Sequence, residues 1–359
     1  MTPEKTQKNS NSEERTIRMP DTSHLIVSSS PHFHAETDIR RIMLTVIIAL
    51  LPACAAGVYY FGWRALWVLL VCSASCISFE AIFSCFMKRP SELDDASALV
   101  TGLLLGMNLP SSTPLGVCIF GSLVAIGIGK MIYGGIGSNP FNPALVGRVA
   151  MLIAFPKVMT TWPIPHGAAT SSAITGATPL MVLGSLQHAA QSGQAGALQT
   201  LGEHVSYMNL YLGNIGGSLG ETCIPALLIG GIFLIYMNII RWQIPVFYIL
   251  TVFCITGLAY MISPAYFAAP TFHIMSGGLM LGAFFMATDM VTTPVSRTGA
   301  IIFAVGCGVI TGSIRLWGSY PEGVSFSILI MNAFTPLIDR YTAGEPFGAP
   351  KDKKRGLQF

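Results

Sequence analysis

Long apolar segments recur along the whole of this sequence, and they constrain its fold more than any other feature. About ten are recognisable, and several reach the roughly 17–25 residues that a helix needs to cross a hydrocarbon core about 30 Å thick. Hydrophobic residues make up 52% of the 359 residues and charged residues only 10%, whereas soluble proteins carry about 25% charged residues. The segments are 42–61, 65–86, 96–109, 114–133, 143–156, 223–240, 244–262, 274–288, 299–316 and 324–338. The sequence therefore predicts an all-α polytopic membrane protein and excludes an ordinary soluble domain.

The positions of Lys and Arg predict how these segments are oriented, because cytoplasmic loops of membrane proteins are enriched in both residues. Basic residues gather in the two polar tails, whereas the longest connection has Lys157 as its only basic residue. We therefore expect both tails to be cytoplasmic and the long connection to be extracytoplasmic. The expected organisation is a tail 1–40, a transmembrane repeat 41–156, an extracytoplasmic loop 157–222, a second transmembrane repeat 223–340 and a basic tail 341–359.

Two parts of the sequence resemble each other, which suggests an internal repeat. Gly102–Gly106 (GLLLG) matches Gly278–Gly282 (GLMLG), and each copy continues into a glycine-rich segment that ends in a cation, Lys130 or Arg315. The copies lie five spans apart, an odd number, so their topologies are opposite. We expect two inverted five-helix repeats with broken half-helices, an architecture typical of transport proteins. The alternative is chance similarity between glycine-rich apolar segments.

The stretch Ser138–Ala144 (SNPFNPA) predicts a break at membrane depth. Its two prolines remove backbone donors, and the carboxamides of Asn139 and Asn142 remain to form hydrogen bonds. One interpretation is a ligand site, because non-helical backbone inside a membrane is tolerated where it lines a cavity. The other is that the asparagines cap the helix that begins at Pro143.

Ionisable residues are rare in the apolar segments and are expensive there, so they are candidates for function. Glu80 lies in the second segment, Arg148 in the fifth, and Asp289 at the end of the eighth. Glu80 and Asp289 could bind a cation or relay protons along an ion path. Alternatively, Asp289 caps a broken helix and Glu80 pairs with a basic residue. The eight cysteines have no metal-ligand spacing, so no metal site is predicted.

The peptide Thr175–Leu180 (TGATPL) lies in the 157–222 loop, in a run of small residues. A hydroxyl residue before a proline, in such a run, is typical of an accessible loop. From these residues alone, Thr178 is either a turn residue or an attachment point for a cofactor.

Three stretches together resemble the NqrB/RnfD family: SNPFNPA at 138–144, TGATPL at 175–180 and GAFFMATD at 282–289. The sequence from Ile314 to Asp339, the Ser30-Pro31-His32 entry to the first helix and the short N-terminal tail are closer to the RnfD branch. The resemblance covers about residues 25–345, nearly the whole chain.

The resemblance implies a membrane subunit of an Rnf-type complex, an ion-translocating ferredoxin:NAD oxidoreductase of the prokaryotic inner membrane. Such proteins carry FMN through a phosphoester on the last Thr of the motif, here Thr178, and an extracytoplasmic flavin transferase makes that bond from FAD. Gly176 and Ala177 would leave room for the transferase, and Thr175 would hydrogen-bond locally. One departure is Ser172, where many members have an acidic residue, which bears on the efficiency of modification.

The resemblance also implies a second, non-covalent flavin (riboflavin), with Asn139 and Asn142 as its candidate ligands. Electrons would pass between ferredoxin and NAD(H) through the flavins, coupled to Na⁺ or H⁺ translocation. Since the flavin ring does the redox chemistry, no catalytic side chain is expected, and the chain is not a complete enzyme alone.

The expected partners are other Rnf membrane subunits, including the FMN-bearing subunit, the iron–sulfur and NADH-binding subunits, and the flavin transferase. No nucleic acid is expected among them. Two alternatives remain open: an NqrB-like subunit of a Na⁺-translocating NADH:quinone reductase, and a secondary transporter with inverted repeats.

Overall fold

The computed structural model describes residues 38–88, 93–165, 175–192, 201, 205–318 and 322–342. Most of both expected tails lies outside this range, as does Ser172. Thr175 is described by its backbone alone.

The regular structure of the described chain is helical, apart from one pair of two-residue strands. The elements are α1 (Ile39–Phe61), α2 (Trp63–Phe86), η2 (Leu93–Asp95), α3 (Ser97–Met107), α4 (Leu115–Gly127), η3 (Met131–Tyr133), α5 (Pro143–Ala154), α6 (Pro156–Met159), β1 (Trp162–Pro163), β2 (Thr175–Gly176), α7 (Pro179–Gln191), α9 (Tyr207–Leu212), η5 (Leu219–Glu221), α10 (Ile224–Tyr236), α11 (Gln243–Ile262), α12 (Pro270–Met275), α13 (Leu279–Leu281), the π-helical η6 (Gly282–Met286), α14 (Arg297–Trp317) and α15 (Val324–Thr342).

Five helical segments of the described chain are long and apolar enough to cross a membrane, so the protein is a multi-pass helical membrane protein, as predicted. They are α1, α2, α11, α14 and Leu115–Tyr133, which joins α4 to η3. Three further apolar helices, α3, α5 and α10, have only 11, 12 and 13 residues. At 1.5 Å per residue these helices are about 17–20 Å long, shorter than the hydrocarbon core.

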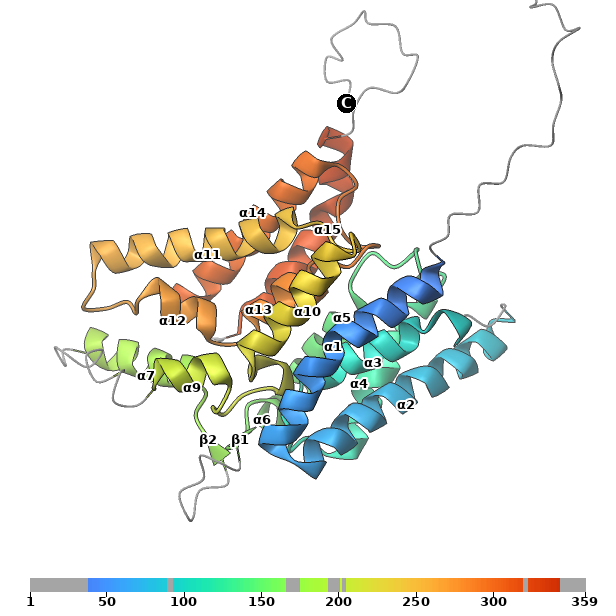
Figure 1. Ribbon diagram of the computed structural model, residues 1–359, viewed down its shortest axis with the longest axis horizontal. Helices are drawn as coiled ribbons and strands as arrows, with labels where there is room; N and C mark the ends of the chain where they lie inside the picture. The colour runs from blue at the N-terminus through green and yellow to red at the C-terminus, as the bar shows by residue number, and fades with distance from the viewer. Residues whose placement is uncertain are drawn as a thin grey trace, which may run out of the picture. The chain divides into compact units, whose positions relative to one another are not determined.

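The helices before and after the long connection pack in similar ways (Figure 1). In the first half, α2 packs against α3 and α4, and α4 packs against α5. In the second half, α11 packs against α12 and α14, and α14 packs against α15. The halves meet where α1 contacts α10 and where α5 contacts α15. Each half thus contributes its first and last helix to the junction.

Glycines allow these helices to come close together. A Cβ atom on Gly102 would lie 2.5 Å from the Cα of Ser73, and one on Gly230 would lie 2.1 Å from the carbonyl oxygen of Ala49. No side chain fits at such distances, so α3 touches α2, and α10 touches α1, backbone to backbone. Close packing at small residues is the usual way in which membrane helices associate.

The expected span 274–288 is not one helix but three short pieces, α12, α13 and η6. α12 ends at Met275, and Gly277 then adopts φ +70, a left-handed conformation that favours glycine. This break leaves carbonyl groups at the end of α12 without helical partners. The guanidinium of Arg315, in α14, takes the place of these partners and donates hydrogen bonds to the carbonyls of His273 and Ser276.

The connection 157–222 has structure of its own within its described parts. β1 pairs antiparallel with β2, with Trp162 opposite Gly176 and Pro163 opposite Thr175. α7 then packs through Leu180 and Leu183 into a small apolar cluster that also contains Phe272 of α12. α7 is therefore attached to the helical bundle by buried side chains.

Candidate functional site

Thr178 occupies the N-cap of α7, directly before Pro179 at the first helical position. Its Oγ1 accepts a hydrogen bond from the backbone N–H of Met181 at 3.2 Å, the ordinary role of a capping threonine. Only 4% of the residue is exposed. The expectation of an accessible hydroxyl therefore does not hold for this conformation, although neighbouring Ala177 is exposed and Gly176 is half-buried.

A cavity of about 770 Å³ opens beside the first turns of α7. We call it the α7 cavity. Its walls come from the end of α5, from α6, β1 and α7, and from the last turn of α14 with the residues after it. They include Leu152, Met159, Trp162, Leu180, Met181, Leu183, His188, Arg315, Leu316, Trp317 and Glu322. The lining is mixed: apolar side chains alternate with polar ones such as Thr160, Ser185 and Gln187, and two residues of opposite charge, Arg315 and Glu322, lie in the wall.

Arg148 of α5 links this cavity to the interior of the bundle. It is 2% exposed, and its guanidinium donates to the backbone carbonyl of Asn108 and to the carboxylate of Glu322. The guanidinium carbon also lies 5.9 Å from the centroid of the Trp162 ring, a cation–π distance. Arg148 thus holds Glu322 and Trp162, two parts of the cavity wall, against α5.

Glu221 lies close to this group, in η5 and outside the spanning helices. It is 6% exposed. Burial, reinforced by the Glu322 carboxylate, raises the pKa of Glu221 to about 7, although Arg148 and a hydrogen bond from Ser218 act in the opposite direction. The carboxyl group therefore changes charge close to neutral pH.

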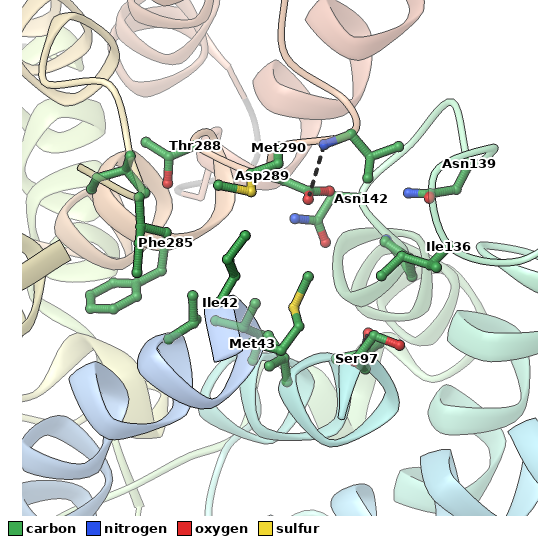
Figure 2. Close-up of a pocket in the computed structure, with 18 of the residues that line it drawn as sticks. Ile42, Met43, Ser97, Ile136, Asn139, Asn142, Phe285, Thr288, Asp289 and Met290 are labelled. Atoms are coloured by element: carbon green, nitrogen blue, oxygen red, sulfur yellow. Dashed lines mark hydrogen bonds between the residues drawn. The ribbon is translucent and has the colours of Figure 1, made fainter. Parts of the chain in front are cut away.

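A second, smaller cavity of about 90 Å³ is lined by both predicted asparagines, and we call it the Asn142 cavity. Figure 2 shows Asn139, Asn142, Asp289 and Ser97 around the same space, with Met43 from α1. Its walls come from the first turns of α1, from α3, the start of α5, the end of α10 and the residues after η6. The structure thus brings together three of the predicted site residues: Asn139, Asn142 and Asp289.

Asn142 serves the local structure and the cavity at once. Its Oδ1 caps α5, accepting from the N–H groups of Ala144 at 3.0 Å and Leu145 at 3.4 Å, while its Nδ2 donates to the carbonyl of Met286 at 3.2 Å. Asn139 bridges only its own turn, donating to the carbonyl of Phe141 at 3.0 Å. The capping interpretation is therefore correct for Asn142, whereas Asn139 stabilises the turn that precedes the helix.

The two predicted ion-path residues are not brought together. Glu80 of α2 is fully buried and pairs with Lys130, Nζ to Oε1 at 2.6 Å, and Lys130 also donates to Ser97 at 2.7 Å. Asp289 faces the Asn142 cavity and accepts from Thr292 at 3.3 Å. The pairing interpretation is therefore correct for Glu80, and Asp289 has the contacts of a turn cap.

A chain of hydrogen bonds joins the two cavities through the bundle. Asn142 donates to the carbonyl of Met286, and the sulfur of Met286 accepts from Asn108 at 3.5 Å. The carbonyl of Asn108 accepts from Arg148, which holds Glu322 in the wall of the α7 cavity. The cavities lie at opposite ends of α5, since Pro143 lines one and Leu152 the other.

In the sequence, Arg148 and Arg315 stand out only as charges in or beside apolar segments, without an assigned role, and neither Glu221 nor Glu322 is among the predicted site residues. The available signal was the cost of a charge in a membrane segment, which marks such residues as functional candidates. Their convergence could not be found this way, since Arg148 and Glu322 are 174 positions apart.

Comparisons with known proteins agree with the family resemblance. A model described as the NQR2, RnfD, RnfE family matches residues 26–348. The chain is 44% identical to the D-type subunit of an ion-translocating oxidoreductase complex from Stutzerimonas stutzeri, over 87% of this chain and 93% of the relative. It is also 44% identical to the corresponding subunits of two ferredoxin:NAD(+) oxidoreductase complexes. One is the proton-translocating complex of Clostridium ljungdahlii (90% and 96% covered), and the other is the Na(+)-translocating complex of Acetobacterium woodii (92% and 98%).

Proposed function

Because the chain belongs to the NQR2, RnfD, RnfE family, we propose that it is the D-type membrane subunit of an ion-translocating ferredoxin:NAD⁺ oxidoreductase complex, with FMN attached to Thr178. Its relatives bear that complex in their names. The observation that carries the flavin assignment is the position of Thr178, at the N-terminus of α7 and two residues before Leu180, which lines a cavity of about 770 Å³.

The α7 cavity fits a flavin in size and in chemistry. Ligand pockets measure roughly 300–1,000 Å³ and combine apolar walls with a few polar groups. An ester on the Thr178 hydroxyl would place its phosphate at the N-terminus of the 13-residue helix α7. The helix dipole favours a negative charge there. The apolar side chains of Leu152, Leu180 and Trp162 would then shield a ring from water.

The attachment reaction is a phosphoryl transfer from FAD. The Oγ of Thr178 forms a bond to the phosphorus on the riboflavin side, the pyrophosphate P–O bond breaks, and AMP leaves. The proton of the hydroxyl passes to a base on the flavin transferase, a separate protein. We place this loop on the extracytoplasmic side, because Lys157 is the only basic residue of 157–222.

When bound, the flavin ring would accept and donate the electrons. The chain supplies its surroundings: Thr178 tethers it, Arg148 fixes Glu322 and Trp162 in the wall, and apolar helices insulate it from solvent. Ferredoxin and NAD(H) are handled by other subunits, and coupling to Na⁺ or H⁺ belongs to the whole complex.

The Asn142 cavity does not fit a second flavin in this conformation. Its volume of about 90 Å³ is far below that of a flavin-sized pocket. Asn139 and Asn142 offer suitable polar groups, so the second flavin remains a prediction that requires the cavity to widen. No electron-transfer step is assigned to it.

We further propose that α1–α5 and α10–α15 form two inverted repeats. The matching contacts support this: α4 packs on α2 and α5 as α14 packs on α11 and α15. The names of the relatives favour an electron-transfer subunit over a secondary transporter with the same architecture.

Covalent flavin tests the proposal directly. The protein would be co-expressed with a flavin transferase, and the denatured band would be examined for flavin fluorescence on a gel. We expect fluorescence in the wild type, none in Thr178→Val, and wild-type fluorescence in the matched control Thr161→Val, at an exposed threonine of the same connection outside the motif. A dark wild-type band, or a bright Thr178→Val band, would contradict the assignment, and mass spectrometry of the loop peptide would identify the adduct.

A further inference from the structure

Arg315 is a buried cation in the wall of the α7 cavity. It lies in the last turn of α14, is 6% exposed, and is one of the residues that line the space beside the first turns of α7. A buried charge is costly unless something compensates it. Its position therefore needs an explanation beyond packing.

Backbone carbonyls hold Arg315 in place. Nη2 donates to the carbonyl of Ser276 at 3.0 Å and Nη1 to that of His273, while Nε has no hydrogen-bond partner. Arg315 forms no ion pair with any residue that the structure describes, in contrast to Lys130 and Arg148. The carbonyls fix the guanidinium, and the carboxyl groups of Glu221 and Glu322 lie near enough to offset part of its charge without forming an ion pair with it.

Gly277 brings this guanidinium next to α7. A Cβ atom on Gly277 would lie 3.0 Å from Nη2 of Arg315 and 2.7 Å from Cδ1 of Leu180. The glycine, at φ +70, therefore fills the narrow space between the cation and the first turn of the helix that Thr178 caps. A group tethered to Thr178 and lying in the cavity would share a wall with Arg315.

We propose that Arg315 sets the redox potential of the flavin bound in the α7 cavity, as a positioning and electrostatic residue. This inference rests on the proposed function. Reduction of the ring by two electrons with uptake of one proton leaves one negative charge on it. A cation that has no ion pair among the described residues, in a low-dielectric wall, stabilises that charge and so favours the reduced form.

The test is an anaerobic reductive titration of the covalently loaded protein in detergent, with a reference dye, followed by the visible absorbance of the oxidised flavin. In Arg315→Gln, which retains hydrogen-bond donors but loses the charge, we expect the ratio of reduced to oxidised flavin at a given potential to fall at least tenfold. That corresponds to about 30 mV for a two-electron couple. Arg315→Lys, which retains the charge, should remain within about twofold of the wild type.

The matched control is Arg297→Gln, the same substitution at an exposed position at the other end of α14, and its potential should be unchanged. Should Arg315→Gln fail to accumulate, Glu322→Gln decides the question, because removal of a negative charge from the same wall should raise the ratio. An unchanged or lower ratio there overturns the inference.

The other outcomes are equally distinct. A loaded Arg315→Gln protein with the wild-type potential overturns the inference alone, as does an Arg315→Lys protein that shifts as far as Arg315→Gln, since the charge would then not be the cause. A wild-type protein without covalent flavin overturns the proposed function and the inference together.

Discussion

The α7 cavity and the Asn142 cavity resemble each other in having a buried cation in the wall, yet the partners of the two cations differ. Each has a buried cation at the end of a glycine-rich helical segment, Arg315 in one and Lys130 in the other. Lys130 pairs with Glu80 at 2.6 Å, whereas Arg315 is held by two carbonyls. The pair at Lys130 is nearly neutral and joins helices, whereas Arg315 has no ion pair among the described residues and lines the larger cavity.

The two cavities also differ in volume, about 90 Å³ against about 770 Å³. The small Asn142 cavity, with its paired Lys130, suits a junction between helices. The larger α7 cavity, with Arg315 in its wall, has room for the redox group of the proposed function. The comparison therefore shows that a buried cation can join helices through an ion pair in one cavity wall and be held by backbone carbonyls in another.

Breaking the Lys130–Glu80 pair should produce the largest effect. Glu80→Leu leaves Lys130 charged in an apolar interior, and loss of one partner of a buried pair costs about 3–5 kcal/mol. Thermal unfolding in detergent should show a strong decrease in Glu80→Leu and in Lys130→Met. The double variant should be clearly more stable than the sum of the single costs implies. Additive costs would show that the pair does not act as a neutral unit.

Glu221 should make stability depend on pH. Its pKa is raised to about 7 in the folded protein, so its contribution is fully present below the ordinary glutamate pKa and is lost as pH rises through about 7. We expect the wild type to lose roughly 1–3 kcal/mol between about pH 5 and pH 8 relative to Glu221→Gln. The measurement is the difference between the two melting curves at each pH. A constant difference would mean that Glu221 does not titrate beside Glu322, Arg148 and Arg315.

Substitution of the two asparagines should have the smallest effects on stability. Asn142→Ala removes the cap of α5 and the bond to Met286, at a cost of about 1–2 kcal/mol. Asn139→Ala removes only a bond within its own turn, at a cost of about 1 kcal/mol or less. Melting curves of the two variants check the order. Equal costs would show that the capping bonds of Asn142 contribute little.

Much of the fold follows from the sequence, because apolar length and proline position act locally. The long spans and the break at Asn139–Pro143 were predicted, and Asn142 is the cap that Pro143 suggests. α7 was not predicted, since its small and polar residues resemble a loop. Its helix depends on Leu180 and Leu183 packing against Phe272, a contact made across the chain.

The candidate site was predictable only in part, for a similar reason. Thr178, Asn139 and Asn142 stand in recognisable local motifs. Arg315, Glu221 and Glu322 do not, because their significance lies in meeting at one end of the bundle from separate segments. Charged residues that meet from distant segments leave no periodic pattern in the sequence from which their contact could be predicted.

The buried cap of α7 bears on the order of events during biogenesis. Thr178 is 4% exposed and already engaged with Met181. A transferase that esterifies this hydroxyl must reach it before α7 docks or during a transient release of its first turn. Loss of such a cap costs about 1 kcal/mol, and release of the first turn would also expose Leu180, which packs in the cluster with Phe272. Under the proposed function, attachment would therefore be easiest before α7 packs against the bundle, so that folding would set the time in which the transferase can act.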